Sequence, residues 1–161
     1  MTPMVRRFLP VRVRQTVLTA HIIMSVGLLG DAAGFLAIAI RAAQTDDPAA
    51  LLEQIRILDM FSAVFGIPLS VGTLLTGLVL GLGTRWGVFR YPWVTTKLAL
   101  IVSVILVGSL VLGPGVEQLQ HGDAAAESRV IAGAAWNTLA LLTATALSVY
   151  KPGRARGRHR T

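Results

Sequence analysis

The chain has 161 residues, of which 53% are hydrophobic and only 14% are charged, and its formal net charge is +7. A soluble domain carries about 25% charged residues, so this composition excludes an ordinary water-soluble domain. The chain contains no cysteine, which excludes disulfides, thiol catalysis and thiolate-bound metal centres.

Four stretches are apolar enough to cross a bilayer, because about 20 consecutive apolar residues in a helix span its hydrocarbon core. None of them alternates polar and apolar residues as a transmembrane strand would. The sequence therefore predicts an all-α membrane protein, an antiparallel four-transmembrane-helix bundle that forms one membrane domain over residues 1–161. We place the spans at residues 16–40, 58–82, 93–113 and 130–150.

Basic and acidic residues are distributed unequally between the segments that flank these spans. Arginine and lysine, without any aspartate or glutamate, occupy residues 1–15, the loop between the second and third spans, and residues 151–161. Because basic flanks stay on the cytoplasmic side, we expect a multi-pass protein of the bacterial inner (plasma) membrane with both termini cytoplasmic. The basic segments would contact anionic headgroups. No nucleic-acid recognition pattern accompanies them, so we expect no nucleic-acid partner.

The segments between the spans carry their own signals. Asp47 and Pro48 form a helix start, with Asp as the cap and Pro at the first helical position. We expect a short amphipathic helix there, which lies on the outer leaflet and runs into the second span. Pro68 should bend that span, Gly113-Pro-Gly should end the third, and Trp86 should sit among the headgroups.

One predicted layer of polar residues lies in the outer-middle part of the membrane and centres on Asp31. Counting along the spans puts Ser70, Ser103 and Asn137 at a comparable depth. An ionised carboxylate there costs at least about 2.5–3.5 kcal/mol, so a protonated Asp31 that donates to Asn137 or to a hydroxyl is the cheaper state. The layer is either a proton- or cation-coupled site or a neutral hydrogen-bonded staple between the first and fourth spans.

A second predicted layer lies near the cytoplasmic side and contains His21, Thr76 and Lys97. Lys97 should extend its side chain to the headgroups. We expect His21 to hydrogen-bond Thr76 or a backbone carbonyl. The alternative is that His21 binds a metal ion or, between two copies of the chain, haem b. Apart from this weak candidate we expect no metal or cofactor, and no catalytic motif is present.

Several short motifs together resemble a known family. They are His21 with Ser25-Val26-Gly27, Thr76-Gly77, Lys97-Leu98 and Leu147-Ser-Val-Tyr-Lys-Pro. This pattern is similar to that of small, mainly actinobacterial, predicted integral membrane proteins classed as a domain of unknown function. The resemblance covers nearly the whole chain and implies a four-helix membrane fold without an established activity. A more distant likeness is to copper-resistance D-type membrane proteins, but their intramembrane histidines are plentiful and this chain has one.

Three hypotheses for function follow from these residues. The first is a non-enzymatic integral inner-membrane protein that is structural or accessory, and a homodimer or a larger membrane complex is the expected partner state. The second is a small proton- or cation-coupled transporter or channel that uses Asp31. The third is a haem- or metal-binding redox membrane protein that uses His21.

Overall fold

The computed structural model describes residues 9–83 and 91–150, and every element in these ranges is helical. The basic terminal segments expected in the cytoplasm lie largely outside the described residues, and so does Trp86. The elements in chain order are α1 (Val11–Ala43), α2 (Pro48–Met60), η1 (Phe61–Gly66), α3 (Ile67–Gly83), α4 (Pro92–Val107), η2 (Gly108–Leu112), α5 (Gly113–Gln120) and α6 (Ala124–Tyr150).

Four continuous helices in the described residues are long and apolar enough to cross a membrane, which confirms the predicted all-α membrane fold. The second consists of α2, η1 and α3, and the third of α4, η2 and α5. At about 1.5 Å per residue these helices are about 40–54 Å long, which exceeds the hydrocarbon core of about 30 Å. They therefore extend beyond the hydrocarbon core. Their bounds are Val11–Ala43, Pro48–Gly83, Pro92–Gln120 and Ala125–Tyr150.

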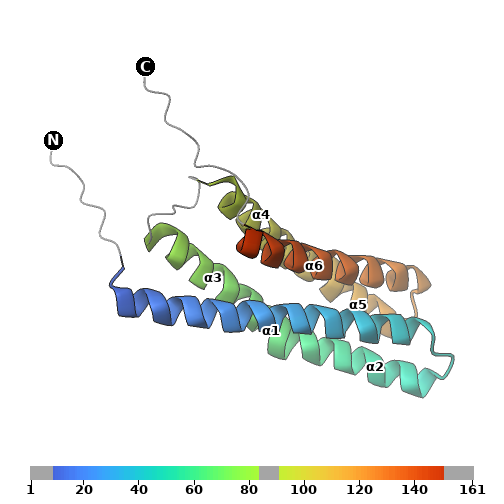
Figure 1. Cartoon of the computed structure of the whole chain (residues 1–161). Coiled ribbons are helices and arrows are strands. Elements are labelled where there is room, and N and C mark those ends of the chain that lie inside the picture. Colours follow the sequence, from blue (N-terminus) through green and yellow to red (C-terminus); the bar gives the residue numbers. More distant parts are fainter. Residues whose placement is uncertain (1–8, 84–90, 151–161) are drawn as a thin grey trace.

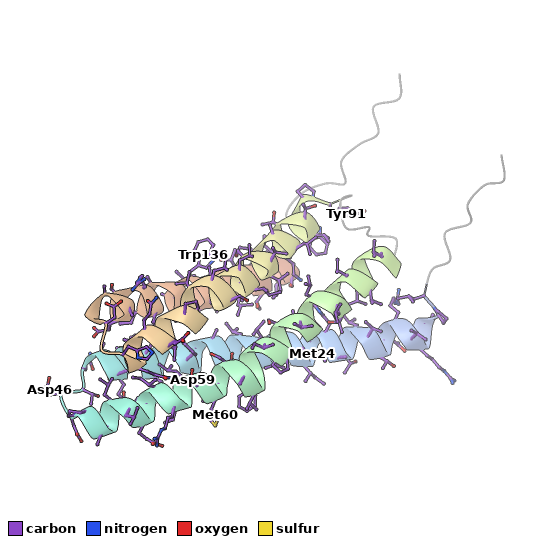
Figure 2. All side chains as sticks on the ribbon, turned by 180° about the vertical axis from the view of Figure 1, so that it is seen from behind. Met24, Asp46, Asp59, Met60, Tyr91 and Trp136 are labelled. Carbon is purple, nitrogen blue, oxygen red and sulfur yellow. The ribbon has the colours of Figure 1, made fainter. Side chains whose placement is uncertain are left out.

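The bundle has two distinct ends. At the end that we call the terminal end, the backbone N–H of Leu9 donates to the carbonyl of Gly83 over 3.0 Å, so α1 begins beside the end of α3. The opposite end, the loop end, holds residues 44–47 and 121–123. Asp46 and Tyr91 lie at opposite ends of the bundle (Figure 2). The antiparallel order of the four spans stays a prediction.

Helix α2 begins where the sequence predicts but does not lie apart from the bundle. The Asp47 carboxylate accepts a hydrogen bond from the backbone N–H of Ala49 over 3.0 Å, which is the N-cap expected before Pro48. From there α2 runs back along the loop-end half of α1 (Figure 1). Its residues Ile55 and Leu58 are buried in a protein core rather than against lipid.

Both interior prolines follow a wide π-helical turn. The N–H of Ile67 donates to the carbonyl of Ser62 just before Pro68, and the N–H of Gly113 donates to the carbonyl of Gly108 just before Pro114. A proline ring clashes with the carbonyl four residues earlier in a regular α-helix, and a π turn gives that carbonyl room. The prediction that Gly113-Pro-Gly ends the third span is therefore wrong, because the helix continues to Gln120.

Two apolar clusters hold the four spans together. Helix α1 packs against α3 and α6, α4 packs against α6, and α3 and α4 touch more sparingly (Figure 1). The cluster that we call the loop-end cluster consists of Phe35, Ala39, Ile55, Leu58, Leu112, Val116, Val130 and Ala134. The mid-bundle cluster, nearer the terminal end, consists of Leu28, Ala32, Val104, Ala140 and Leu141.

Candidate functional site

A cavity of about 390 Å³ lies between these two clusters, and we call it the central cavity. Asp31 from α1, Ser70 from α3 and Asn137 from α6 all line it, so the structure brings three of the four residues of the predicted outer-middle layer together. Most of the other lining residues are aliphatic. The cavity thus combines an apolar wall with a few polar groups, as ligand pockets in proteins do.

Ser103, the fourth residue of that predicted layer, lies elsewhere. Its hydroxyl donates to the carbonyl of Leu100 over 2.8 Å and accepts a hydrogen bond from the indole N–H of Trp136 over 3.3 Å. Ser103 is not among the residues that line the cavity. In its place Ser62 and Ser109 line it, each from a π-helical turn.

Asp31 and Asn137 are the two principal polar side chains of the cavity, and they do not satisfy each other's hydrogen-bonding groups. Asn137 is buried, with 7% of its surface exposed. Within residues 9–83 and 91–150, neither its side-chain oxygen nor Oδ1 of Asp31 has a hydrogen-bond partner. A Cβ on Gly66 would lie 3.3 Å from Oδ2 of Asp31, so the carboxyl group lies directly against that glycine. The expected hydrogen-bonded staple between α1 and α6 therefore does not form through these atoms.

The predicted inner layer is split into two hydrogen-bonded pairs. The first joins His21 in α1 to Thr76 in α3, with 2.9 Å between Nδ1 and Oγ1, which is the contact expected from the sequence. The hydroxyl of Thr76 donates its proton to the carbonyl of Gly72 over 2.6 Å. With its proton directed to that carbonyl, the Thr76 hydroxyl is placed to accept from His21, which indicates a proton on Nδ1 of His21.

The second pair joins Lys97 in α4 to Ser148 in α6. The Lys97 ammonium donates to Oγ of Ser148 over 2.7 Å, and this hydroxyl in turn donates to the carbonyl of Ala144 over 2.9 Å. Ser148 lies two residues before the end of α6 at Tyr150. The lysine side chain therefore reaches toward the terminal end of the bundle, but a neighbouring helix holds its charged group. Extension to the headgroups stays a prediction.

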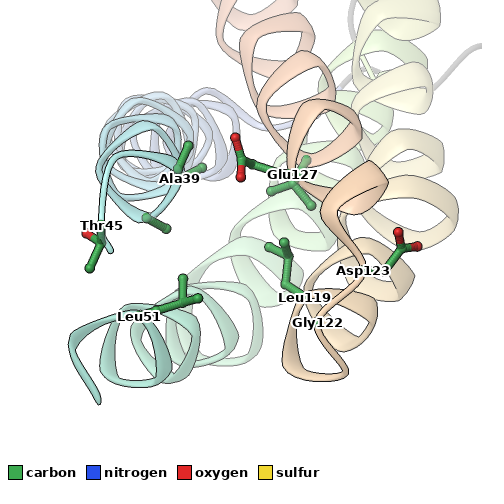
Figure 3. Close-up of a pocket in the computed structure, with 10 residues that line it drawn as sticks. Ala39, Thr45, Leu51, Leu119, Gly122, Asp123 and Glu127 are labelled. Atoms are coloured by element: carbon green, nitrogen blue, oxygen red, sulfur yellow. The ribbon is translucent and has the colours of Figure 1, made fainter. Parts of the chain in front are cut away.

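A smaller pocket of about 220 Å³ lies at the loop end, where α1, α2, α5 and α6 meet (Figure 3). Asp123 and Glu127 are the acidic residues among those that line it. The Arg129 guanidinium lies 3.0 Å from Oδ2 of Asp123 and is its ion-pair partner. We call this the loop-end pocket. The loop-end cluster separates it from the central cavity.

The arrangement of possible ligands bears on metal and haem chemistry. No three side chains of His, Asp or Glu in the described part of the chain lie close enough together to hold a metal ion. Nδ1 of His21, the one histidine in a described span, is engaged by the hydroxyl of Thr76. The expectation that the protein carries no haem or metal stays a prediction.

The fold and cavity define the class of this molecule: an integral membrane protein with four helical spans around an internal cavity that is partly polar. The chain belongs to the family described as "Predicted integral membrane protein (DUF2269)", whose model matches residues 15–152. This match includes all four spans and confirms the family resemblance seen in the sequence motifs. No curated protein and no solved structure matches the chain.

Proposed function

We propose that this membrane protein is non-enzymatic and couples the binding of a proton or a small cation at Asp31 to the movement of a ligand across the bilayer. The observation that carries the proposal is the central cavity, in which acceptor oxygens of Asp31 and of buried Asn137 lack hydrogen-bond partners among the described residues. A structural staple would instead satisfy these atoms with each other.

The energetics favour an occupant for this cavity. A buried acceptor without a partner costs about 1–3 kcal/mol, and an ionised carboxylate inside a membrane costs more. A bound proton removes the charge of Asp31, and a bound cation compensates it. Either event changes the interactions inside a cavity that touches α1, α3, α4 and α6, so it can bias how these helices pack.

The test is cation-driven proton movement in proteoliposomes. Gradients of sodium and potassium are imposed in turn, and a trapped pH-sensitive dye reports the internal pH. We expect at least one gradient to drive proton movement through the wild-type protein and none to do so through Asp31→Asn. Asp46→Asn is the matched control, because Asp46 is exposed in the loop between α1 and α2.

Two results would contradict the proposal. Proton movement that survives Asp31→Asn would exclude Asp31 as the coupling group. Wild-type protein that moves no protons under any gradient would leave the structural or accessory role as the better hypothesis. Co-purification from native membranes, with a partner recovered reproducibly, would then be the deciding observation.

We also propose that the protein resides in the bacterial plasma membrane with both termini in the cytoplasm. The support is the excess of arginine and lysine in residues 1–15 and 151–161. Fusion of alkaline phosphatase or of green fluorescent protein to the C-terminus tests this orientation. We expect fluorescence without phosphatase activity, and phosphatase activity would show that the chain is threaded the other way.

A further inference from the structure

The walls of the central cavity differ in their exposure. The lining residues of α1 and α6 are buried except for Asp31, which is partly exposed. On α3 the lining residues Ile67 and Val71 are 62% and 45% exposed. Ser109 and Gly113, which line the cavity from η2 and α5, are also exposed. The cavity therefore opens between α3 and the segment formed by η2 and α5.

The cavity is closed along the length of the bundle. Toward the loop end, Phe35, Leu112 and Ala134 line it and belong to the buried loop-end cluster. Toward the terminal end, Leu28 and Leu141 line it and belong to the buried mid-bundle cluster. A solute in water on either side of the membrane thus meets a packed apolar layer before it reaches Asp31.

The opening lies at the depth of the hydrocarbon core. Val71 is 13 residues from one end of the predicted span 58–82 and 11 from the other, which puts it roughly 16–20 Å from each end at about 1.5 Å per residue. A core of about 30 Å places Ile67 and Val71 among lipid chains. The entrance to the central cavity therefore faces lipid and not water.

The polar groups inside the cavity select the chemistry of its occupant. The unpartnered atoms of Asp31 and Asn137 in the described structure are both oxygens, which accept hydrogen bonds. Among the described residues that line the cavity, Asp31 alone is ionisable, and none is basic. An ammonium group supplies both the positive charge and several N–H donors, whereas an anion would meet the carboxyl group without a compensating cation.

We infer that the central cavity binds an amphiphilic amine, which enters from the lipid phase through the opening between α3 and η2. This inference rests on the proposed function, because both use Asp31 to hold a cation. The ammonium group contacts Asp31 and Asn137, and the apolar part of the molecule lies against the aliphatic wall and the mouth at Ile67 and Val71. A cavity of about 390 Å³ is large enough for a small organic ligand.

Equilibrium binding to purified protein in lipid nanodiscs tests this inference with three probes. Octylammonium has both a positive charge and a long alkyl group. Methylammonium has only the positive charge, and octanol has only the long alkyl group. We expect octylammonium to bind wild-type protein at least about tenfold more tightly than either of the others. Equal binding of methylammonium, or displacement of octylammonium by potassium alone, would overturn the amphiphilic class and leave a cation site at Asp31.

A matched pair of variants tests the entrance. Val71 and Val79 both lie on α3 and are 45% and 43% exposed, but only Val71 lines the cavity. We expect Val71→Trp to slow the association of octylammonium at least about tenfold and Val79→Trp to leave the association rate unchanged. If octylammonium associates with both variants as fast as with wild type, lateral entry is refuted. A loss of binding in Asp31→Asn would in that case still support the proposed function, and retained binding in Asp31→Asn would refute both proposals.

Cysteine variants provide a second test of the entrance in case a tryptophan variant does not fold. The chain contains no cysteine, so Val71→Cys and Val79→Cys each introduce a single thiol. Alkylation of the folded, purified protein with N-phenylmaleimide then adds bulk at one position. We expect octylammonium to associate with the modified Val71→Cys protein more slowly than with the modified Val79→Cys protein. Equal association rates for the two modified proteins would refute the lateral entrance.

Discussion

The contact between α5 and α6 offers a stringent test of the packing. Gly115 and Val130 meet where these helices touch, and a Cβ added to Gly115 would lie 2.6 Å from Cγ2 of Val130. Carbon atoms in contact are about 3.5–4.0 Å apart, so Gly115→Ala creates an overlap of about 1 Å. Val130 is only 1% exposed, and a β-branched side chain on a helix has essentially one rotamer. The clash must be relieved by a shift of the backbone.

This overpacking should cost about 1–3 kcal/mol of the free energy of unfolding. Gly30→Ala is the control, because nothing lies within 4 Å of a Cβ at Gly30, and it should change stability by no more than about 1 kcal/mol. Reversible unfolding in mixed micelles of increasing sodium dodecyl sulfate, followed by circular dichroism, measures both variants. Adding Val130→Ala to Gly115→Ala should recover part of the loss in a double-mutant cycle.

The reasoning is refuted if Gly115→Ala and Gly30→Ala unfold at the same midpoint. It is also refuted if the cycle gives no coupling between Gly115 and Val130. Either result would mean that α5 and α6 do not approach each other closely at this point, and that the loop-end cluster is packed differently.

Three further predictions concern single side chains. Asp47→Ala should cost about 1 kcal/mol through loss of the N-cap of α2, measured by the same unfolding assay, while Asp46→Ala should be neutral. Thr76→Val should cost about 1–3 kcal/mol because it leaves the N–H of His21 without an acceptor, whereas Thr143→Val, on an exposed face of α6, should not. Protein incubated with haem b and then washed should show no Soret band, and a band that disappears in His21→Ala would contradict this.

Much of the fold can be predicted from the sequence, because the hydropathy of a segment indicates whether lipid or water surrounds it. The interiors of the four spans were predictable for that reason. Counting residues from the span ends also predicted that Asp31, Ser70 and Asn137 share a level. Depth along a helix is fixed by its rise per residue, so it can be read without knowing which helices are neighbours.

Which residues face the central cavity depends on how each helix is rotated about its own axis, and the sequence alone does not indicate this rotation. Ser62 and Ser109 reach the central cavity because they lie in π-helical turns, and the α-helical period assigns residues around such turns to the wrong face. The same wide turns explain why Pro114 does not end the third span. Whether Asp31 meets Asn137 is likewise decided by how α1 and α6 are rotated, so depth alone could not predict that they leave each other unpaired.

The helices that extend beyond the hydrocarbon core give the bundle two different stabilising forces. Around Ile55 and Val116, near the loop end, burial removes apolar surface from water, so the hydrophobic effect operates there as it does in a soluble protein. Around Leu28 and Leu141 the competing solvent is lipid, and close van der Waals packing must supply the stability instead. Urea should therefore unfold the loop end of the bundle while the lipid-embedded half stays folded. Harsh detergents should instead act first on the lipid-embedded half, which surrounds the mouth of the central cavity.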